Sequence, residues 1–284
     1  AGESFGFSVS VAGDVNGDGR NDMIVGAINN PTAGVNAGRA YVYYEGPSAD
    51  AVADLTFTGA AASDQFGNSV SGAGDMNGDG YADVIVGAWG NDAGGSSAGR
   101  AYVYYGGVGA DGVADLTFTG ALGLDQLGTS VSGAGDVNGD SYADVIVGSF
   151  QNDAGGVDAG RAYIYYGGPA ADAVADLTLT GAAAGDHFGI SVSGAGDVNG
   201  DGYPDVIVGA HRAGGAGAGR AYVMTSRPFD VVSPHGGELW VAGLEQRIRW
   251  LGADRADLWI SFDGGASYSL LTSGVGGGPE NEFA

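Results

Sequence analysis

Residues 75–83 read D-M-N-G-D-G-Y-A-D, and this short acidic stretch decides how the rest of the chain is interpreted. Closely related stretches begin at Asp14, Asp136 and Asp197, so the three successive intervals are each 61 residues long. The flanking sequence repeats as well, because Phe-Gly or Leu-Gly precedes each stretch and Ala-Gly-Arg-Ala-Tyr follows it. A fixed period of this length indicates a repeat architecture, in which each copy forms one structural unit.

Each unit contains four short apolar runs separated by Gly, Asp and Asn, which in the second copy are residues 69–73, 83–88, 100–105 and 115–119. The run Val84-Ile85-Val86 is β-branched and continuously apolar, as expected of a strand buried on both faces. Four strands per repeat of this length predict a propeller blade. A solenoid of β-turns is the alternative, although its repeats are usually shorter. We therefore expect an all-β fold with four 61-residue, four-stranded blades.

Composition excludes several classes of protein. With 58 Gly among 284 residues, long helices are not expected, because Gly weakens helix interiors. Acidic residues number 34 against ten basic ones, all of them Arg, so the formal net charge is -24. A surface this acidic repels phosphate backbones, so we expect no nucleic-acid partner. No Cys is present, and no 18-residue apolar run occurs, so we expect neither disulfides nor membrane insertion.

The repeated acidic stretch has the pattern D-x-N-x-D-G-x-x-D, which gathers carboxylate and amide oxygens in nine residues. Crowded carboxylates repel one another unless a hard cation lies between them, and oxygen ligands favour Ca²⁺. The sequence therefore predicts four calcium sites, in which the seventh loop position contributes its backbone carbonyl, so that its side chain should hardly matter. The predicted ligands are Asp14, Asn16, Asp18, Arg20 and Asp22; Asp75, Asn77, Asp79, Tyr81 and Asp83; Asp136, Asn138, Asp140, Tyr142 and Asp144; and Asp197, Asn199, Asp201, Tyr203 and Asp205.

Two other interpretations of the acidic stretch are an EF-hand and a metal-free hairpin. An EF-hand requires Glu at position twelve and a following helix, but position twelve is Val25, Val86, Val147 or Val208, inside a predicted strand. A tight hairpin without metal is the remaining alternative, since Asn-Gly and Asp-Gly favour turns. Turn formation does not explain why the last Asp of the pattern is present in every copy. In the third copy Ser141 replaces the Gly at position six, so we expect the weakest calcium site there.

The order Phe-Gly, Gly-Ala-Gly-Asp, acidic loop and Val-Gly-Ala resembles the FG-GAP repeat of integrin α-subunit β-propellers, over about residues 1–226. The resemblance implies that each repeat is a blade, that calcium binds the loop between its first and second strands, and that ligands meet the opposite face. Propellers of that family usually have seven blades. We therefore expect the four copies, with Ala1 lying inside the lead-in to a repeat, to be part of a larger propeller.

Residues 227–284 lack the acidic loop and form a second predicted domain. Residues 231–232, 239–241, 247–250 and 258–262 read as strands. The stretch S-P-H-G-G-E-L-W, followed by I-R-W, resembles immunoglobulin-like modules of secreted bacterial proteins. A complete sandwich of that kind needs about 100 residues, so we expect an incomplete one here.

Function is expected to be binding rather than catalysis, because the three His lie in different segments and no hydrolase motif accompanies them. His187 is expected to be an ordinary polar loop residue. The loops that follow the second strands vary at Asn29, Trp89, Phe150 and His211, and they are the predicted ligand-binding positions. In a simpler account Trp89 and Phe150 fill gaps between blades.

The interpretation is a calcium-binding, non-catalytic adhesion or ligand-binding module at the outside or surface of a bacterial or archaeal cell, with an extracellular protein or glycan as its partner. The alternatives are a calcium-stabilised structural repeat and an accessory domain of a secreted hydrolase. The Arg residues at 39, 100, 161 and 220 recur in every copy and are expected to pair with an acidic or carbonyl group of their own blade.

Overall fold

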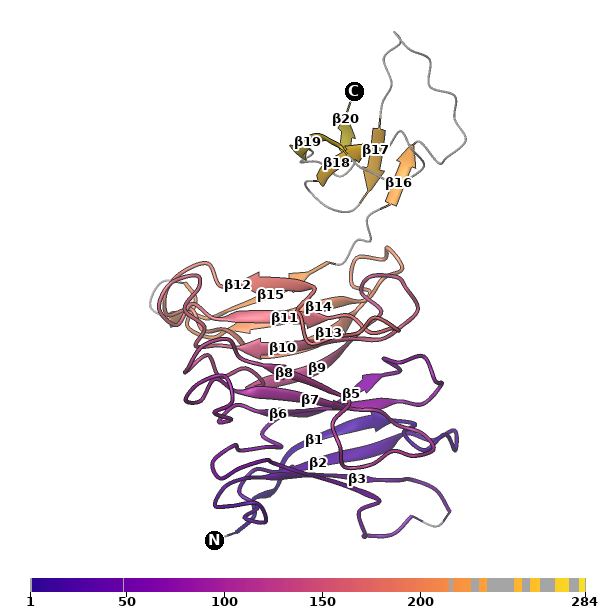
Figure 1. The fold of residues 1–284 in the computed structure, drawn as a ribbon, viewed down its shortest axis with the longest axis vertical. Helices are drawn as coiled ribbons and strands as arrows, with labels where there is room; N and C mark the ends of the chain where they lie inside the picture. The colour runs from indigo at the N-terminus through magenta and orange to yellow at the C-terminus, as the bar shows by residue number, and fades with distance from the viewer. Residues whose placement is uncertain are drawn as a thin grey trace. The chain divides into compact units, whose positions relative to one another are not determined.

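The protein is described from a computed structural model, which divides the chain into two compact units, Ala1–Thr225 and Ser226–Ala284. It describes residues 2–47, 49–214 and 217–225 of the first unit, and the strand segments 230–233, 248–251, 256–260, 269–275 and 281–283 of the second. Every regular element in the described residues is a β-strand (Figure 1), so the predicted all-β class is confirmed. No described segment forms a helix long and apolar enough to cross a membrane.

Each repeat forms its own antiparallel sheet, with its strands in chain order from one edge to the other. The first strands are β1 (Phe5–Gly13), β5 (Val70–Gly74), β9 (Ser130–Gly135) and β13 (Phe188–Gly196). The second strands are β2 (Asp22–Ala27), β6 (Asp83–Ala88), β10 (Asp144–Ser149) and β14 (Asp205–Ala210). The third strands are β3 (Arg39–Tyr43), β7 (Arg100–Tyr104), β11 (Arg161–Tyr165) and β15 (Arg220–Met224). The fourth strands are β4 (Leu55–Thr58), β8 (Leu116–Thr119) and β12 (Leu177–Thr180).

The fourth sheet has three strands in the part of the chain that the structure describes, where four were expected. The first three repeats build their fourth strand from Asp-Leu-Thr-x-Thr, and no such sequence follows Met224 at the corresponding distance. The next described strand, β16 (Asp230–Ser233), pairs instead with β17 (Ile248–Leu251) of the second unit.

The second unit also contains β18 (Ala256–Ile260), β19 (Ser269–Val275) and β20 (Asn281–Phe283). Strand β20 pairs with β17, and β18 pairs with β19. The strands predicted near 231–232, 247–250 and 258–262 are found, whereas the one predicted at 239–241 lies outside the described residues. Whether this unit is an incomplete immunoglobulin-like sandwich stays a prediction.

Within the first unit the four sheets lie face to face (Figure 1), and the core consists of three apolar clusters, each between two neighbouring sheets. In the first cluster Phe57 of one blade stacks on Tyr104 of the next with ring centroids 3.9 Å apart, and Phe118 repeats the contact with Tyr165 at 3.7 Å. This face-to-face stacking of separate sheets is the packing of propeller blades, so the propeller-type repeats are confirmed and the solenoid alternative is wrong.

The first sheet has an apolar face that no described sheet covers. Val9 and Met23 are 69% and 46% exposed, whereas Val70 and Val84, one repeat later, are 6% and 1% exposed because the first blade packs on them.

The close approach of neighbouring first strands also explains why the repeats differ between Gly and Val at one position of this strand. A Cβ on Gly72 would lie 2.9 Å from the carbonyl oxygens of Val11 and Ala12 in the strand in front of it, while the first repeat has Val at this position, which is 60% exposed.

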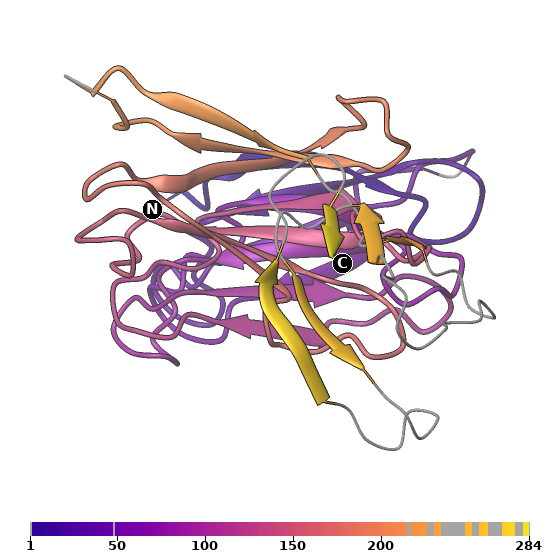
Figure 2. The same cartoon turned by 90° about the horizontal axis from the view of Figure 1, so that it is seen from above.

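The loops of this unit collect at two opposite ends of the sheets (Figure 2). The acidic-loop end carries the connections between first and second strands, which contain the D-x-N-x-D-G-x-x-D pattern. The variable-loop end carries the connections between second and third strands, residues 28–38, 89–99, 150–160 and, in the fourth repeat, 211–214 and 217–219. The fold thus separates the predicted calcium loops from the predicted ligand-binding residues.

Candidate functional site: the acidic loops

The four acidic loops share one hydrogen-bonding pattern, anchored on the Asp at the first position. Asp14 Oδ1 accepts hydrogen bonds from the backbone N–H groups of Gly17 and Asp18 at 2.7 and 2.9 Å, and its Oδ2 accepts one from Gly19 at 2.8 Å. Asp75, Asp136 and Asp197 accept the corresponding three bonds at 2.6 to 3.1 Å. The side chain therefore folds the loop around itself, which aligns the other oxygens of the pattern.

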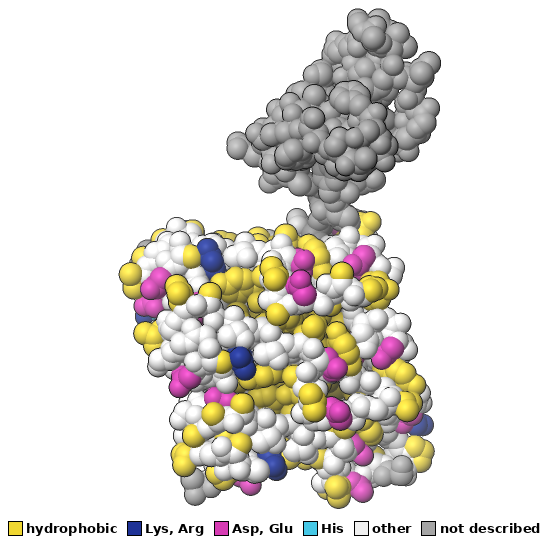
Figure 3. All heavy atoms as spheres, viewed as in Figure 1, with side chains coloured by type: hydrophobic (Ala, Val, Ile, Leu, Met, Phe, Trp, Pro, Cys, Tyr) yellow, Lys and Arg dark blue, Asp and Glu magenta, His cyan; other side chains and the backbone are white. Residues whose placement is uncertain are grey.

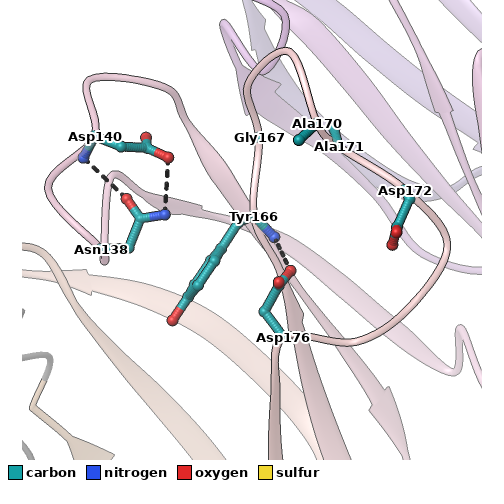
Figure 4. Close-up of a pocket in the computed structure, with 8 residues that line it drawn as sticks. All are labelled: Asn138, Asp140, Tyr166, Gly167, Ala170, Ala171, Asp172 and Asp176. Atoms are coloured by element: carbon teal, nitrogen blue, oxygen red, sulfur yellow. Dashed lines mark hydrogen bonds between the residues drawn. The ribbon is translucent and has the colours of Figure 1, made fainter. Parts of the chain in front are cut away.

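The Asn at the third position and the Asp at the fifth are linked within each loop. Asn138 Oδ1 accepts from the backbone N–H of Asp140 at 2.9 Å, and Asn138 Nδ2 donates to Asp140 Oδ2 at 2.9 Å (Figure 4). In the first loop Arg20 Nη1 approaches Asp18 Oδ2 at 4.0 Å, the only ion pair among the described residues. The Asp at position five is exposed in the first three loops, whereas Asp201 is half-buried in the fourth.

The last Asp of each pattern is fully buried at the start of the second strand: Asp22, Asp83, Asp144 and Asp205 are all 0% exposed. Asp83 accepts hydrogen bonds from the backbone N–H groups of Met76 in its own loop and Gly106 beyond the third strand, at 2.8 and 2.9 Å. Asp22 and Asp144 make the same two bonds. This carboxylate thus ties the acidic loop to the end of the third strand.

Burial has an electrostatic cost for these carboxylates. Desolvation raises the pKa of Asp83 to about 7, only partly offset by the N–H groups of Gly106 and Met76, and the nearby charges of Asp79 and Asp75 raise it further. The pKa of Asp144 is raised to about 7 for the same reasons, and that of Asp22 is also raised by burial. A cation in the loop would relieve the desolvation and the mutual repulsion of the three carboxylates.

Shallow acidic pockets lie beside two of the loops. Asn138 and Asp140 line one of about 200 Å³ together with Tyr166, Asp172 and Asp176 (Figure 4). In that pocket Asp176 Oδ2 accepts the backbone N–H of Tyr166 at 2.7 Å. A similar pocket of about 150 Å³ adjoins Asn16 and Asp18. Acidic side chains are common on the surface and Arg is rare (Figure 3), so these pockets attract cations.

The side chain at loop position seven has a role that sequence reasoning missed. The Tyr81 ring lies against Gly17 of the preceding acidic loop and against Gly107, and the Tyr142 ring lies against Gly78 in the same way. A Cβ at Gly17 would come within 2.3 Å of Tyr81 Cε1. The first three loops therefore contact their neighbours through these rings, and Gly17 and Gly78, at the fourth position of the pattern, leave room for them.

The donor set suits Ca²⁺, because it consists of carboxylate and amide oxygens together with backbone carbonyls. No group of three or more His, Asp and Glu side chains in the described residues is placed to hold a metal ion by itself, so the amide and carbonyl oxygens would have to share the coordination. A carboxylate has about four lone-pair positions, so the backbone hydrogen bonds leave acceptor capacity at the first and last Asp. The same bonds would also hold the loop as a hairpin without metal, the alternative left open by the sequence.

The variable-loop end places the predicted ligand-binding residues in unlike surroundings. Trp89 and Phe150 are half-buried, Asn29 donates from Nδ2 to Ser4 Oγ at 2.9 Å, and only His211 is exposed. Phe150 contacts His187 with ring centroids 5.2 Å apart, so it fills part of the junction between the third and fourth blades, as the simpler account expected. His187 lies in a loop, as expected, with a φ of 56° that matches the 53° and 54° of Gln65 and Gln126. It is also 6% exposed and contacts the rings of Phe150 and His211, which the sequence did not predict.

The recurrent Arg residues pair within their own blades, but with a hydroxyl group rather than with an acidic or carbonyl group. Arg39, Arg100 and Arg161 donate from Nε to Thr58, Thr119 and Thr180 at 3.0 to 3.2 Å. Each Thr lies directly opposite its Arg in the fourth strand, so the pair closes the edge of the sheet. These side chains are structural in the first three blades.

Comparison with known proteins agrees with this architecture. The family described as FG-GAP repeat matches residues 5–43, 66–104, 127–165 and 188–224, which is more than half of the chain, so the chain belongs to the FG-GAP repeat family. The resemblance to integrin α-subunits is also confirmed. The chain is 33% identical over 187 residues to integrin alpha-5 of Xenopus laevis, covering 62% of this chain and 17% of that protein.

Two further integrins show the same degree of similarity. Integrin alpha-V of Gallus gallus is 32% identical over 234 residues, covering 78% of this chain and 21% of that protein. Integrin alpha-IIb of Homo sapiens is 36% identical over 163 residues, covering 51% of this chain and 15% of that protein. The chain therefore spans about a fifth or less of the length of these relatives.

Proposed function

We propose that this chain is a calcium-binding, non-catalytic module that binds an extracellular protein or glycan at the cell surface or outside the cell. The membership in the FG-GAP family and the similarity to integrin α-subunits support an adhesion or ligand-binding role. The observation that supports calcium binding is the buried last Asp of the second and third acidic loops, Asp83 and Asp144. Each is desolvated beside two further carboxylates, and no described cationic side chain forms an ion pair with it.

Calcium would be held by the first, third, fifth and ninth residues of each loop and by the backbone carbonyl at the seventh, for example Asp75, Asn77, Asp79, Tyr81 and Asp83. When bound, the ion supplies positive charge that offsets the repulsion among the carboxylates. Extracellular calcium modules bind at about 0.1 to 1 mM, so such sites are filled outside cells.

Thermal unfolding with and without calcium tests the proposal. Saturation at about 100 times the dissociation constant stabilises a protein by about 2.7 kcal/mol per site, so excess chelator should lower the melting temperature clearly. Isothermal calorimetry of the chelated protein should detect four sites, one per loop, and the same titration with Mg²⁺ should give weaker binding. If no calcium binds and chelator leaves the melting temperature unchanged, the proposal is wrong and the acidic loops are hairpins without metal.

A purely structural role for the calcium-stabilised repeats is the competing function. An array of glycans and extracellular matrix proteins, probed with the calcium-loaded protein, separates the two. Binding that persists in 0.15 M salt and depends on residues of the variable-loop end supports the ligand-binding module. No binding to any class of partner, with intact calcium uptake, supports the structural role.

A further inference from the structure

The variable-loop end of the fourth repeat differs from the other three in the polar groups it contains. In the first three repeats a buried Asn follows the second strand, and Asn30, Asn91 and Asn152 donate to the hydroxyl groups of Tyr41, Tyr102 and Tyr163 at 3.1 to 3.5 Å. The same amides bind an acidic side chain, as Asn91 does with Asp64 at 3.0 Å. Each amide thus joins a carboxylate to a tyrosine hydroxyl.

Ala213 replaces this Asn in the fourth repeat, where its N–H makes the same turn bond to Ala210 at 3.1 Å. The hydroxyl group of Tyr222 is consequently buried without a hydrogen-bond partner. Nδ1 of His187 is the second of only three buried polar side-chain atoms in the described residues that lack a partner, and both lie in this repeat. A buried polar group without a partner costs about 1 to 3 kcal/mol of stability. Packing of the fourth blade therefore does not explain why these two polar atoms are buried at this end.

His187 stands beside two further nitrogen-bearing side chains. Arg212 Nη1 lies 3.3 Å from His187 Nε2, and the rings of His187 and His211 are 5.0 Å apart. Arg212 can only donate, so Nε2 must be the acceptor and the ring proton must sit on the buried Nδ1. Burial, then the Arg212 charge and His211 lower the pKa of His187, while Asp158 raises it, and the ring is therefore neutral at pH 7.

The Arg212 guanidinium forms no ion pair within the described residues. No acidic side chain in that part of the chain comes within 4.0 Å of it. Arg212 and His211 are both exposed, so the cluster is open to solvent at its outer side. Within the described residues the Arg212 guanidinium thus has the neutral His187 Nε2 as its acceptor and no carboxylate, in a protein whose net charge is -24.

We propose that Arg212, His187 and His211 form a binding site for a carboxylate group, that of an Asp or Glu side chain of a protein partner. A carboxylate beside Arg212 accepts from the guanidinium in place of His187 Nε2. The ring proton of His187 then moves from Nδ1 to Nε2 through solvent, with no net proton uptake, and Nε2–H donates to the ligand. This change removes the unpartnered buried N–H. A uronate sugar carries the same carboxylate, but we favour the protein side chain because Phe150, an aromatic ring that a sugar could stack on, already packs against His187.

This site rests on the proposed ligand-binding function and specifies its chemistry. The test is a nuclear magnetic resonance titration of the calcium-loaded protein, labelled with ¹⁵N-histidine, using blocked aspartate (N-acetyl-aspartate N-methylamide). We expect saturable shifts of the His187 and His211 ring nitrogens at millimolar ligand, with His187 showing the change from Nδ1–H to Nε2–H. His235, in the second unit, is the internal reference and should not shift in parallel.

Variants and a second ligand make the outcome decisive. Arg212→Gln should weaken binding at least tenfold, whereas Arg100→Gln, the matched control at the same end of the second blade, should leave it unchanged. Equal shifts with blocked asparagine, or unchanged binding in Arg212→Gln, overturn the carboxylate site. Tighter binding of glucuronate than of blocked aspartate overturns the protein side chain as the source. Loss of this site with calcium uptake and partner binding intact leaves the proposed function standing.

Discussion

At the scale of single residues, the last Asp of each acidic loop has two roles that can be separated experimentally. Asp83 accepts N–H groups from Met76 and Gly106 while it is fully buried. An amide in its place can accept with only one atom, so Asp83→Asn turns an NH₂ group toward one of these donors. We expect a loss of about 1 to 3 kcal/mol in the free energy of unfolding even in chelator, measured by urea denaturation.

Asp79→Asn is the matched control in the same loop, because the Asp79 side chain is exposed and accepts from Asn77 Nδ2 and the backbone N–H of Tyr81. It should change the unfolding free energy in chelator by less than about 0.5 kcal/mol, yet weaken calcium binding. Equal losses for the two variants without calcium would contradict the structural role assigned to the buried carboxylate.

Ser141 provides a second prediction at this scale. It has a φ of 75°, in the range where Gly19, Gly80 and Gly202 have 84°, 91° and 93°, and it keeps the bond from its N–H to Asp136 Oδ2 at 2.8 Å. A non-Gly residue in this conformation costs about 1 kcal/mol. We expect Ser141→Gly to tighten the third calcium site by up to about fivefold in calorimetry.

The reverse exchange, Gly80→Ser, should weaken the second site by a similar factor. No atom lies within 4 Å of the position that its Cβ would take, so any effect comes from backbone strain alone. If both exchanges leave calcium affinity unchanged, strain at the sixth loop position does not control binding.

At the scale of secondary-structure elements, the first strands set how closely two blades can approach. A Cβ on Gly72 would lie 2.9 Å from carbonyl oxygens in the first strand of the preceding blade. The first repeat carries the exposed Val11 at the equivalent position. Gly72→Val should therefore push the first two blades apart and cost about 1 to 3 kcal/mol, measured by urea denaturation. Val11→Gly, the opposite change at the uncovered face, should cost less than about 1 kcal/mol.

The elements themselves follow from local sequence. Strands expected at 83–88, 100–105 and 115–119 are found as β6, β7 and β8 with ends shifted by at most one residue. Apolar β-branched runs bounded by Gly and Asp favour strands wherever they occur, so these assignments needed no tertiary information. That the fourth sheet has three strands in its described part was not anticipated, because the prediction extended the pattern of the first three copies to the fourth.

At the scale of the whole molecule, charge is the dominant property. A net charge of -24 makes the folded unit repel itself, and its described residues hold a single ion pair to offset this. In chelator we expect the melting temperature to rise as NaCl increases from about 0.01 to 0.15 M, because the screening length falls from about 30 to 8 Å. Calcium at equal ionic strength should raise it further. A melting temperature that does not change with salt in chelator would show that repulsion among the acidic groups contributes little to the free energy of unfolding.

The sequence alone determined what depends on neighbours along the chain: the 61-residue period, the strands, the turn-forming acidic loop and the strain at Ser141. The tertiary structure decided which of these residues are buried and what they touch. Packing of one blade on the next makes Val70 core and leaves Val9 exposed, and it places the Tyr81 ring on Gly17. Replacement of one Asn by Ala213 leaves Tyr222 without a partner, whereas His187 lies beside Arg212. Burial and pairing depend on residues distant in sequence, and a repeat pattern records only what the copies share.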